Sequence, residues 1–129
     1  MTDEQLKAIL SDYITNLDAR VGTQAGEARL AAHESMFQMA SNAPNDLWRL
    51  LEIAWDSELG DRELGMLAAG ALEDLLGHHG EDFMEKLEIA ARQNSKARFM
   101  VAGVWRGGMS NAVWERFLLL REPFGIKPL

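Results

Sequence analysis

The residues best suited to chemistry in this sequence are two adjacent histidines, His78 and His79, which stand among acids. Asp74 lies four positions before His78, so one helix face would present both side chains to a single cation. Histidine is equally favourable beside a helix C-terminus, and Glu73 and Asp74 suit the first turn of a helix that restarts at Ala71. The spacing is looser than that of established zinc motifs. We therefore expect no metal and no cofactor, and leave open whether Glu73, Asp74, His78 and His79 are functional or only stabilise helix ends.

A third histidine, His33, is followed by Glu34 in the order that opens a zinc-protease motif. The second metal ligand of that motif would stand at position 37, which is Phe37. His33 shares a predicted helix face with Leu30 and Phe37, so we interpret it as a half-buried packing residue. The chain has no GxSxG nucleophile elbow and no cysteine, which excludes thiolate catalysis and disulfides. These observations favour a protein that is not an enzyme.

A glycine pair before a predicted helix start is the second candidate site. Arg106, Gly107 and Gly108 precede Ser110, whose hydroxyl has the position of an N-cap. An arginine and free backbone N–H groups can hold an anion, although the GxxxxGK[ST] phosphate-binding string is absent. A tight turn that uses glycine for a positive φ, followed by a serine cap, explains the same residues. Anion binding is kept here as an alternative.

Charge is spread unevenly along the 129 residues. Residues 1–90 hold 18 of the 20 acids and 6 of the 13 bases, a net charge of −12, whereas residues 91–129 have a net charge of +5. Such asymmetry bears on partners and association rates rather than on fold. The acidic candidates for a partner site are Glu81, Glu85 and Glu88, expected on one helix face, together with Glu52 and Asp56.

The basic C-terminal third supports a second hypothesis, which is nucleic-acid binding. Arginines near aromatic side chains are typical of surfaces that bind single strands, where bases stack on the rings. The residues concerned are Arg98, Arg106, Arg116 and Arg121, with Trp105 and Trp114.

Apolar residues recur at helical spacing along almost the whole chain, and no stretch alternates long enough to form a strand. Hydrophobic residues make up 47% of the sequence, which suits one globular domain of this length. We therefore predict a single all-α domain over residues 1–129. Its seven helices are expected at 3–18, 25–41, 45–58, 61–77, 81–93, 96–106 and 111–121, with an extended tail over 122–129.

Local signals mark several of these helix ends. Thr2 and Gln5 have capping-box spacing. Pro44 suits the first turn of a helix, because the N–H that it lacks would be unpaired there. Ser95 and Ser110 are the expected N-caps of the last two helices.

The segment 45–58 is expected to be the buried centre of the fold, because it is apolar nearly all round. Only Arg49, Glu52 and Asp56 align along it as a narrow polar face. Its apolar residues are Leu47, Trp48, Leu50, Leu51, Ile53, Ala54 and Trp55.

Apolar spacing also predicts the inward faces of the other helices. Leu30, Phe37 and Ala40 share one face of 25–41, and Trp105 should be buried at the end of 96–106. Gly70 should break the helix over 61–77, since glycine costs roughly 1 kcal/mol against alanine in a helix interior. Short helices joined by short loops indicate antiparallel hairpins, stacked as in a HEAT-like solenoid or gathered in a compact bundle.

The most distinctive stretch of the chain is residues 70–80, which read G-A-L-E-D-L-L-G-H-H-G. Together with Leu47-Trp48 and Val104-Trp105, it resembles a family of small uncharacterised bacterial domains that share a G-x-L-E-D-L-L-x-x-H-G core. The similarity covers about residues 45–117. The family often has proline after the first glycine, where this chain has Ala71. The resemblance implies a helical domain and brings no activity or functional residue.

We conclude from the sequence that the chain is a non-enzymatic protein-binding module with an acidic surface for a basic partner. A narrower hypothesis is an immunity-type inhibitor of a bacterial toxin, since charge complementarity speeds capture. Nucleic-acid or anion binding, and an enzyme of unfamiliar geometry, are the alternatives. The N-terminus lacks a secretory signal, and no apolar run approaches the ~20 residues that span a bilayer, so we expect a cytoplasmic protein.

Overall fold

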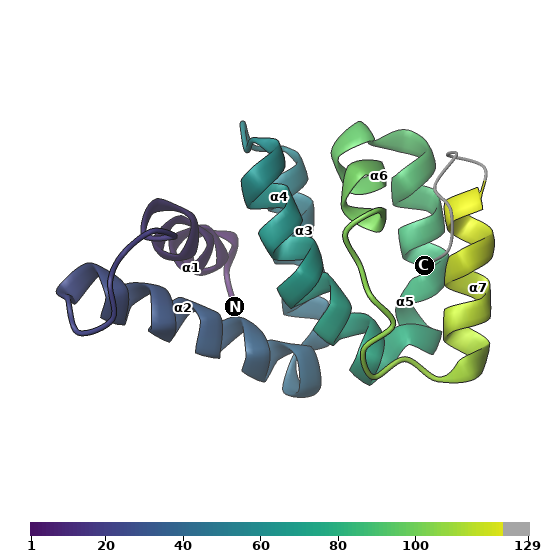
Figure 1. Cartoon of the computed structure of the whole chain (residues 1–129), viewed down its shortest axis with the longest axis horizontal. Helices are drawn as coiled ribbons and strands as arrows, with labels where there is room; N and C mark the ends of the chain where they lie inside the picture. Colours follow the sequence, from purple (N-terminus) through teal and green to yellow (C-terminus); the bar gives the residue numbers. More distant parts are fainter. Residues whose placement is uncertain (123–129) are drawn as a thin grey trace. The chain divides into compact units, whose positions relative to one another are not determined.

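The computed structural model describes residues 1–122, and every regular element within them is a helix (Figure 1). This confirms the all-α prediction; the predicted extended tail falls, from residue 123 onward, outside the described residues. The elements are α1 (Asp3–Thr15), α2 (Gln24–Asn42), α3 (Pro44–Trp55), α4 (Asp61–Leu67), the π-helical segment η1 (Ala68–Leu72), α5 (Glu73–Gln93), α6 (Ser95–Val101) and α7 (Asn111–Arg121).

The chain divides into two compact units, Met1–Ser57 and Glu58–Leu129. The single domain with stacked hairpins therefore stays a prediction, and each unit is described by itself. No helix within residues 1–122 has both the length and the apolarity to cross a bilayer.

In the first unit α1, α2 and α3 each pack on the other two. The predicted capping box of α1 is present: the Gln5 N–H donates to Thr2 Oγ1 at 3.2 Å, and the Thr2 N–H donates to Gln5 Oε1 at 2.9 Å. Pro44 occupies the first turn of α3 as predicted. Arg49 makes a two-pronged ion pair with Asp3 of α1, and the hydrogen bonds from its guanidinium hold the pKa of that carboxyl below its ordinary value.

Helix α3 is the core of this unit, as its sequence predicts. All seven of its predicted apolar residues are buried, while Arg49 and Asp56 are exposed and Glu52 is partly exposed along one side. Trp48 and Trp55 meet edge to face, with ring centroids 5.3 Å apart.

The predicted face of α2 is wrong at two of its three positions, since Ala40 is fully buried but the other two are not. Leu30 and Phe37 are 45% and 47% exposed, and His33 is exposed rather than half-buried, with its ring stacked on Tyr13 at 6.4 Å between centroids. The buried face combines three small residues with two methionines, and at Gly26 the absence of a side chain lets the Arg20 carbonyl approach closely. It comprises Gly26, Ala32, Met36, Met39 and Ala40.

In the second unit the two helices predicted over 61–77 and 81–93 form one continuous run, α4–η1–α5. The backbone does not break at Gly70; it widens there into a π-helical turn. The spacing of the buried residues explains this turn. They recur every four positions, but four residues of an α-helix rotate by about 40° more than a full turn, so a regular α-helix would carry them away from the buried face. A π-helix turns less per residue, so η1 keeps them on one face. They are Leu64, Ala68, Leu72 and Leu76 in one row and Leu67, Ala71 and Leu75 in the other.

The prediction for residues 96–106 also needs correction. Helix α6 ends at Val101, and its N-cap is Asn94 rather than Ser95: Asn94 Oδ1 accepts from the N–H groups of Lys96 at 2.9 Å and Ala97 at 3.2 Å. A loop over 102–110 follows, and in it Trp105 is 62% exposed instead of buried. Ser110 caps α7 as predicted.

Candidate functional site

The loop over 102–110 runs alongside the start of α5 and is held there at successive points. The backbone N–H of Trp105 donates to Glu73 Oε1 at 2.9 Å. Gly107 has a positive φ of +51°, and a Cβ at this position would lie 3.1 Å from Glu73 Cγ. One helical turn further along, a Cβ on Gly77 would lie 3.5 Å from the Cα of Gly108. The glycines thus let the loop backbone lie directly against the helix.

The contact continues at Gly80, where α5 meets α7. A Cβ on Gly80 would lie 2.6 Å from Val113 Cγ1, closer than carbon atoms pack. The residue before it, His79, has non-helical backbone angles (φ −137°, ψ 31°) and marks a kink in α5. Glu73, Gly77 and Gly80, all within the distinctive 70–80 stretch, therefore have a packing role against residues 105–113.

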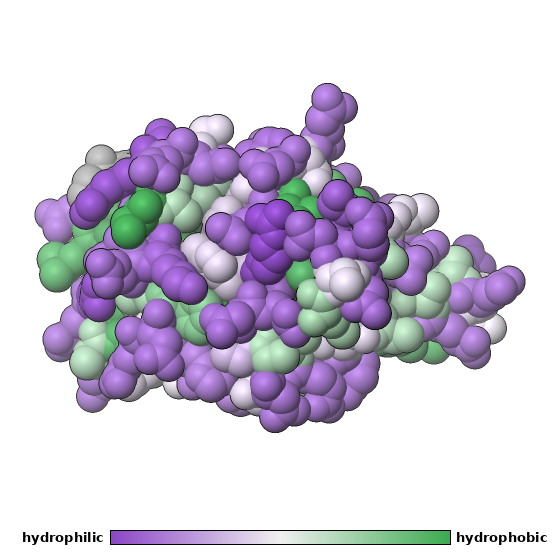
Figure 2. Space-filling view, turned by 180° about the vertical axis from the view of Figure 1, so that it is seen from behind, coloured by the Kyte–Doolittle hydropathy of each residue, from purple (hydrophilic) through white to green (hydrophobic). Residues whose placement is uncertain are grey.

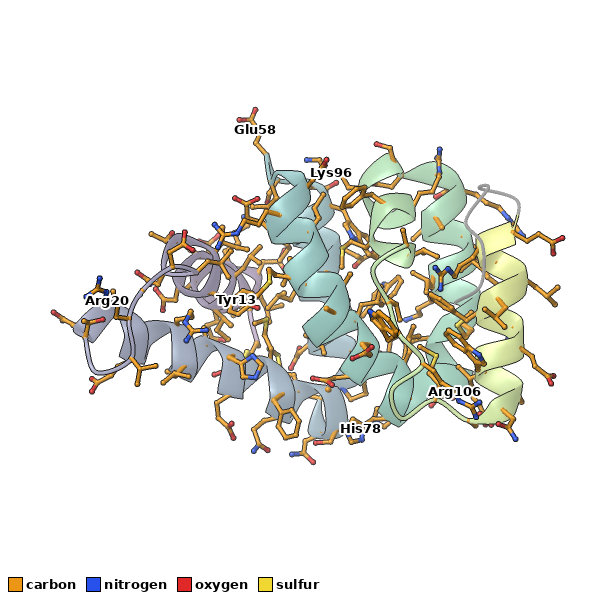
Figure 3. The ribbon with its side chains drawn as sticks, viewed as in Figure 1. Tyr13, Arg20, Glu58, His78, Lys96 and Arg106 are labelled. Carbon is orange, nitrogen blue, oxygen red and sulfur yellow. The ribbon has the colours of Figure 1, made fainter. Side chains whose placement is uncertain are left out.

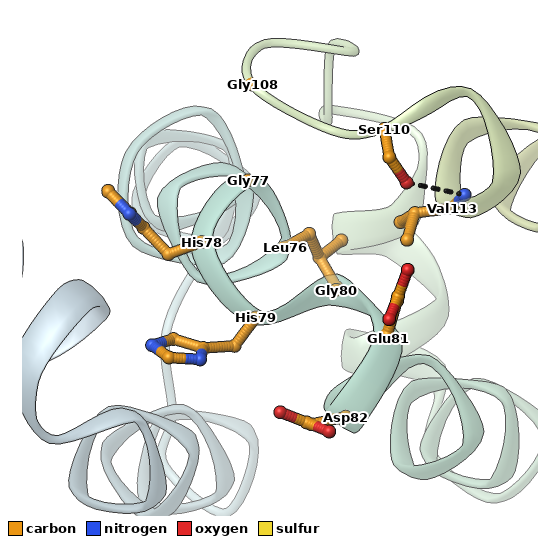
Figure 4. A pocket seen from close by; sticks show the side chains of 10 residues that line it. All are labelled: Leu76, Gly77, His78, His79, Gly80, Glu81, Asp82, Gly108, Ser110 and Val113. Carbon is orange, nitrogen blue, oxygen red and sulfur yellow. Dashed lines mark hydrogen bonds between the residues drawn. The ribbon is translucent and has the colours of Figure 1, made fainter.

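A cavity of about 260 Å³ lies beside this kink (Figure 4). In Figure 4, His78 and His79 project to one side of α5, whereas Glu81 points toward Ser110 and Val113. The described residues contain no group of three or more side chains placed to hold a metal ion. The cavity is lined by Leu76, Gly77, His78, His79, Gly80, Glu81, Asp82, Gly108, Ser110 and Val113.

The three glutamates predicted as a partner site all lie on α5, but they are not equivalent. Glu81 and Glu85 are exposed. Glu88 is half-buried and binds Arg116 of α7, with its Oε1 2.5 Å from Nη2 of the arginine. That hydrogen bond raises the pKa of Arg116, and the charge of Glu85 adds to the effect. The free acidic surface of α5 therefore consists of Glu81, Glu85 and the neighbouring Asp82, which is also exposed.

The two other predicted acids belong to the first unit. Glu52 lies 3.5 Å from Arg49 of the same helix, and Asp56 is exposed at the C-cap of α3. A partner site that includes Glu52 and Asp56 stays a prediction.

The arginines of the basic third make contacts within the chain. Arg98 Nε donates to the carbonyl of Ala91 at 3.0 Å. Arg106 bonds the carbonyl of Met109 and the side chain of Asn111, so it closes its own loop. With the Glu81 and Asp82 carboxylates lining the adjoining cavity, the anion site predicted at Arg106, Gly107, Gly108 and Ser110 gains no support from this geometry.

The remaining predicted nucleic-acid residues are engaged as well. Arg116 is paired with Glu88, and Arg121 is 2% exposed, with its guanidinium over the Phe117 ring. Burial lowers the pKa of Arg121. Trp114 stacks on Phe117 with ring centroids 5.6 Å apart. Base stacking needs exposed rings and free cations, and these residues offer few.

Sequence reasoning missed the most exposed aromatic residue among residues 1–122, which is Trp105. Its apolar spacing with Val101 and Val104 suggested a longer helix. The available signal was Gly103, because glycine is disfavoured in a helix interior and α6 ends two residues before it.

We expect Glu73→Ala to loosen the Trp105 loop selectively. The substitution removes a carboxylate acceptor from the Trp105 N–H, a loss of about 1 kcal/mol in net terms. Amide hydrogen exchange should show faster exchange at Trp105 to Gly108, with little change at Leu6 or Leu10 of α1. Protection in the loop equal to that of the parent would show that Glu73 does not hold it.

A profile of a family of unknown function (DUF6869) matches residues 22–123. The match reaches further at both ends than the predicted similarity over about 45–117, and it crosses the boundary between the two compact units. The proposed G-x-L-E-D-L-L-x-x-H-G core and the bacterial origin stay predictions. No curated protein and no solved structure matches the chain.

Proposed function

We propose that this chain, which belongs to the DUF6869 family of unknown function, acts as a protein-binding module that captures a basic protein through α5. The observation that carries the proposal is the set of exposed acids after the kink, Glu81, Asp82 and Glu85. Phe83, Met84 and Leu87 are buried beneath them, so the acids stand on a helix that is fixed in place.

The arrangement of charge supports a basic partner over a nucleic acid. A helix face with several free carboxylates repels phosphates and attracts lysine and arginine side chains, which raises the association rate. The immunity-type inhibitor of a basic toxin is the narrower form of the same proposal, in the cytoplasm of a bacterium. It rests on this charge complementarity alone.

The test is capture from the native host with two variants that change the net charge equally. Glu81→Gln with Glu85→Gln removes charge from α5 and leaves the Glu88–Arg116 pair intact. Glu27→Gln with Glu34→Gln removes the same charge from exposed positions on α2. Quantitative mass spectrometry should show a basic protein enriched by the parent and by the α2 variant, but depleted with the α5 variant.

The captured protein should then associate roughly 3- to 10-fold more slowly with the α5 variant at low salt, and the difference should shrink as salt screens the charges. Stopped-flow mixing over a salt series measures this. If both variants associate at the parent's rate, the acidic face of α5 is not the contact surface.

A further inference from the structure

Trp105 is the one large aromatic side chain of residues 1–122 that is mainly exposed, at 62%. Its backbone is nevertheless fixed by three neighbouring contacts with α5: the hydrogen bond to Glu73, the close approach of Gly107 to the Glu73 side chain, and the approach of Gly108 to Gly77. An exposed tryptophan on a preorganised backbone loses little conformational entropy on binding, and tryptophan is enriched among the residues that dominate interface energies.

The surroundings of Trp105 indicate what it binds. Its backbone lies beside Glu73, and the loop then runs along α5 to Gly108, which lies against Gly77. Gly108 itself lines the cavity, together with Glu81 and Asp82, so the loop from Trp105 to Gly108 leads directly to the acidic cavity and forms one strip with it. A guanidinium group suits both ends of it, because it stacks on an indole face and pairs with carboxylates.

We propose that this strip is the docking site for an arginine-rich segment of the basic partner. One arginine stacks on the Trp105 indole, and a neighbouring arginine enters the cavity beside Glu81 and Asp82. The proposal rests on the proposed function and adds the identity of the recognised side chain. Arginine is favoured over lysine, because an ammonium group pairs with the carboxylates but lacks the flat face that stacks on a ring.

Two cations flank the strip, one on α5 and one in the loop. Lys86 lies four residues after Asp82 on α5, with its ammonium group 5.1 Å from the centre of the Phe83 ring. Arg106 follows Trp105 in the loop (Figure 3). Its guanidinium is directed to the Met109 carbonyl and to Asn111, on the side where the loop closes before α7. Its repulsion should weaken the binding of any cationic segment, so Arg106→Gln is expected to strengthen it.

Two labelled probes of equal charge, hexa-arginine and hexa-lysine, separate stacking from general attraction. Fluorescence anisotropy at low salt should show that hexa-arginine binds the parent roughly fivefold more tightly than hexa-lysine, the equivalent of about 1 kcal/mol for one cation–π contact. In ¹H–¹⁵N spectra, hexa-arginine should shift the Trp105 indole N–H and the amides of Gly108 and Asp82.

Four variants test which residues cause the preference for arginine and the binding of both probes. Trp105→Ala should remove the preference for arginine and leave hexa-lysine binding nearly unchanged. Glu81→Gln with Asp82→Asn should weaken both probes. Leu119→Ala, at a residue of similar exposure (67%), and the α2 pair Glu27→Gln with Glu34→Gln should leave the preference intact.

A preference for arginine that persists in Trp105→Ala would overturn the proposal, as would shifts scattered over all exposed acids. Either result is distinct from a failure of the proposed function. If capture of the partner still depends on Glu81 and Glu85, the proposed function stands. Only the role of Trp105 in binding is then rejected.

Discussion

Replacing Trp55 by alanine is expected to lower the free energy of unfolding of the first unit by about 3–5 kcal/mol, the range for a buried aromatic residue. Trp55 is 6% exposed, sits at the end of α3 and meets the ring of Trp48 edge to face. Its loss removes buried apolar contact, including that with Trp48, and leaves a cavity beside α3. Trp48→Ala should have an effect of similar size.

Urea unfolding followed by circular dichroism measures this loss, and the chain provides a matched control. Trp105→Ala makes the same chemical change at an exposed site, where substitutions usually stay within about 0.5 kcal/mol. The double variant of Trp48 and Trp55 should be less destabilised than the sum of the single variants, because each has already lost their mutual contact. Equal midpoints for Trp55→Ala and Trp105→Ala would show that α3 is not the core.

Gly80→Ala is expected to destabilise the second unit by about 1–3 kcal/mol, the usual cost of overpacking. The new methyl group would lie 2.6 Å from Val113 Cγ1 and 3.0 Å from Cγ2. Valine in a helix is nearly confined to one rotamer, so the side chain cannot turn away and α7 must shift.

The rescue variant Val113→Ala tests this mechanism. It has a cost of its own, but it makes room for the methyl group, so the double variant should be at least ~1 kcal/mol more stable than additivity predicts. Gly65→Ala is the control: it has no neighbour within 4 Å of the added carbon and should stabilise α4 by up to roughly 1 kcal/mol. Additive costs at positions 80 and 113 would show that the two side chains do not compete for space.

Local features were predictable from the sequence because they depend on a few adjacent residues. The capping box at Thr2, the first-turn Pro44 and the Ser110 cap all formed as expected. The burial of α3 was equally predictable, since a helix that is apolar nearly all round has no other stable place.

The errors arose where the size of a side chain mattered more than its hydrophobicity. On α2 the packed face uses Gly26 and Ala32 in place of the larger Leu30 and Phe37. A Cβ at Gly26 would lie 2.0 Å from the carbonyl oxygen of Arg20, a constraint that no hydropathy pattern reveals.

The candidate site was predictable only in part. The acids of α5 could be assigned to an outward face from their spacing, but the pairing of Glu88 with Arg116 joins residues 28 positions apart. The exposure of Trp105 depends equally on a distant contact, because the Glu73 carboxylate fixes the loop from 32 positions away.

The π-helical turn over Ala68–Leu72 has a consequence for the length of the chain. A π turn holds more residues than the α turn that would replace it, so a residue can be removed there while the helix on either side keeps its orientation. Gly70 suits such a deletion best, since no side chain packs against the position of its missing Cβ. The same deletion at Glu85 would rotate the rest of α5 by about 100° and turn Leu87 and Ala91 out of the core. Relatives that differ by a single residue within this helical run are therefore expected to carry the difference between residues 68 and 72.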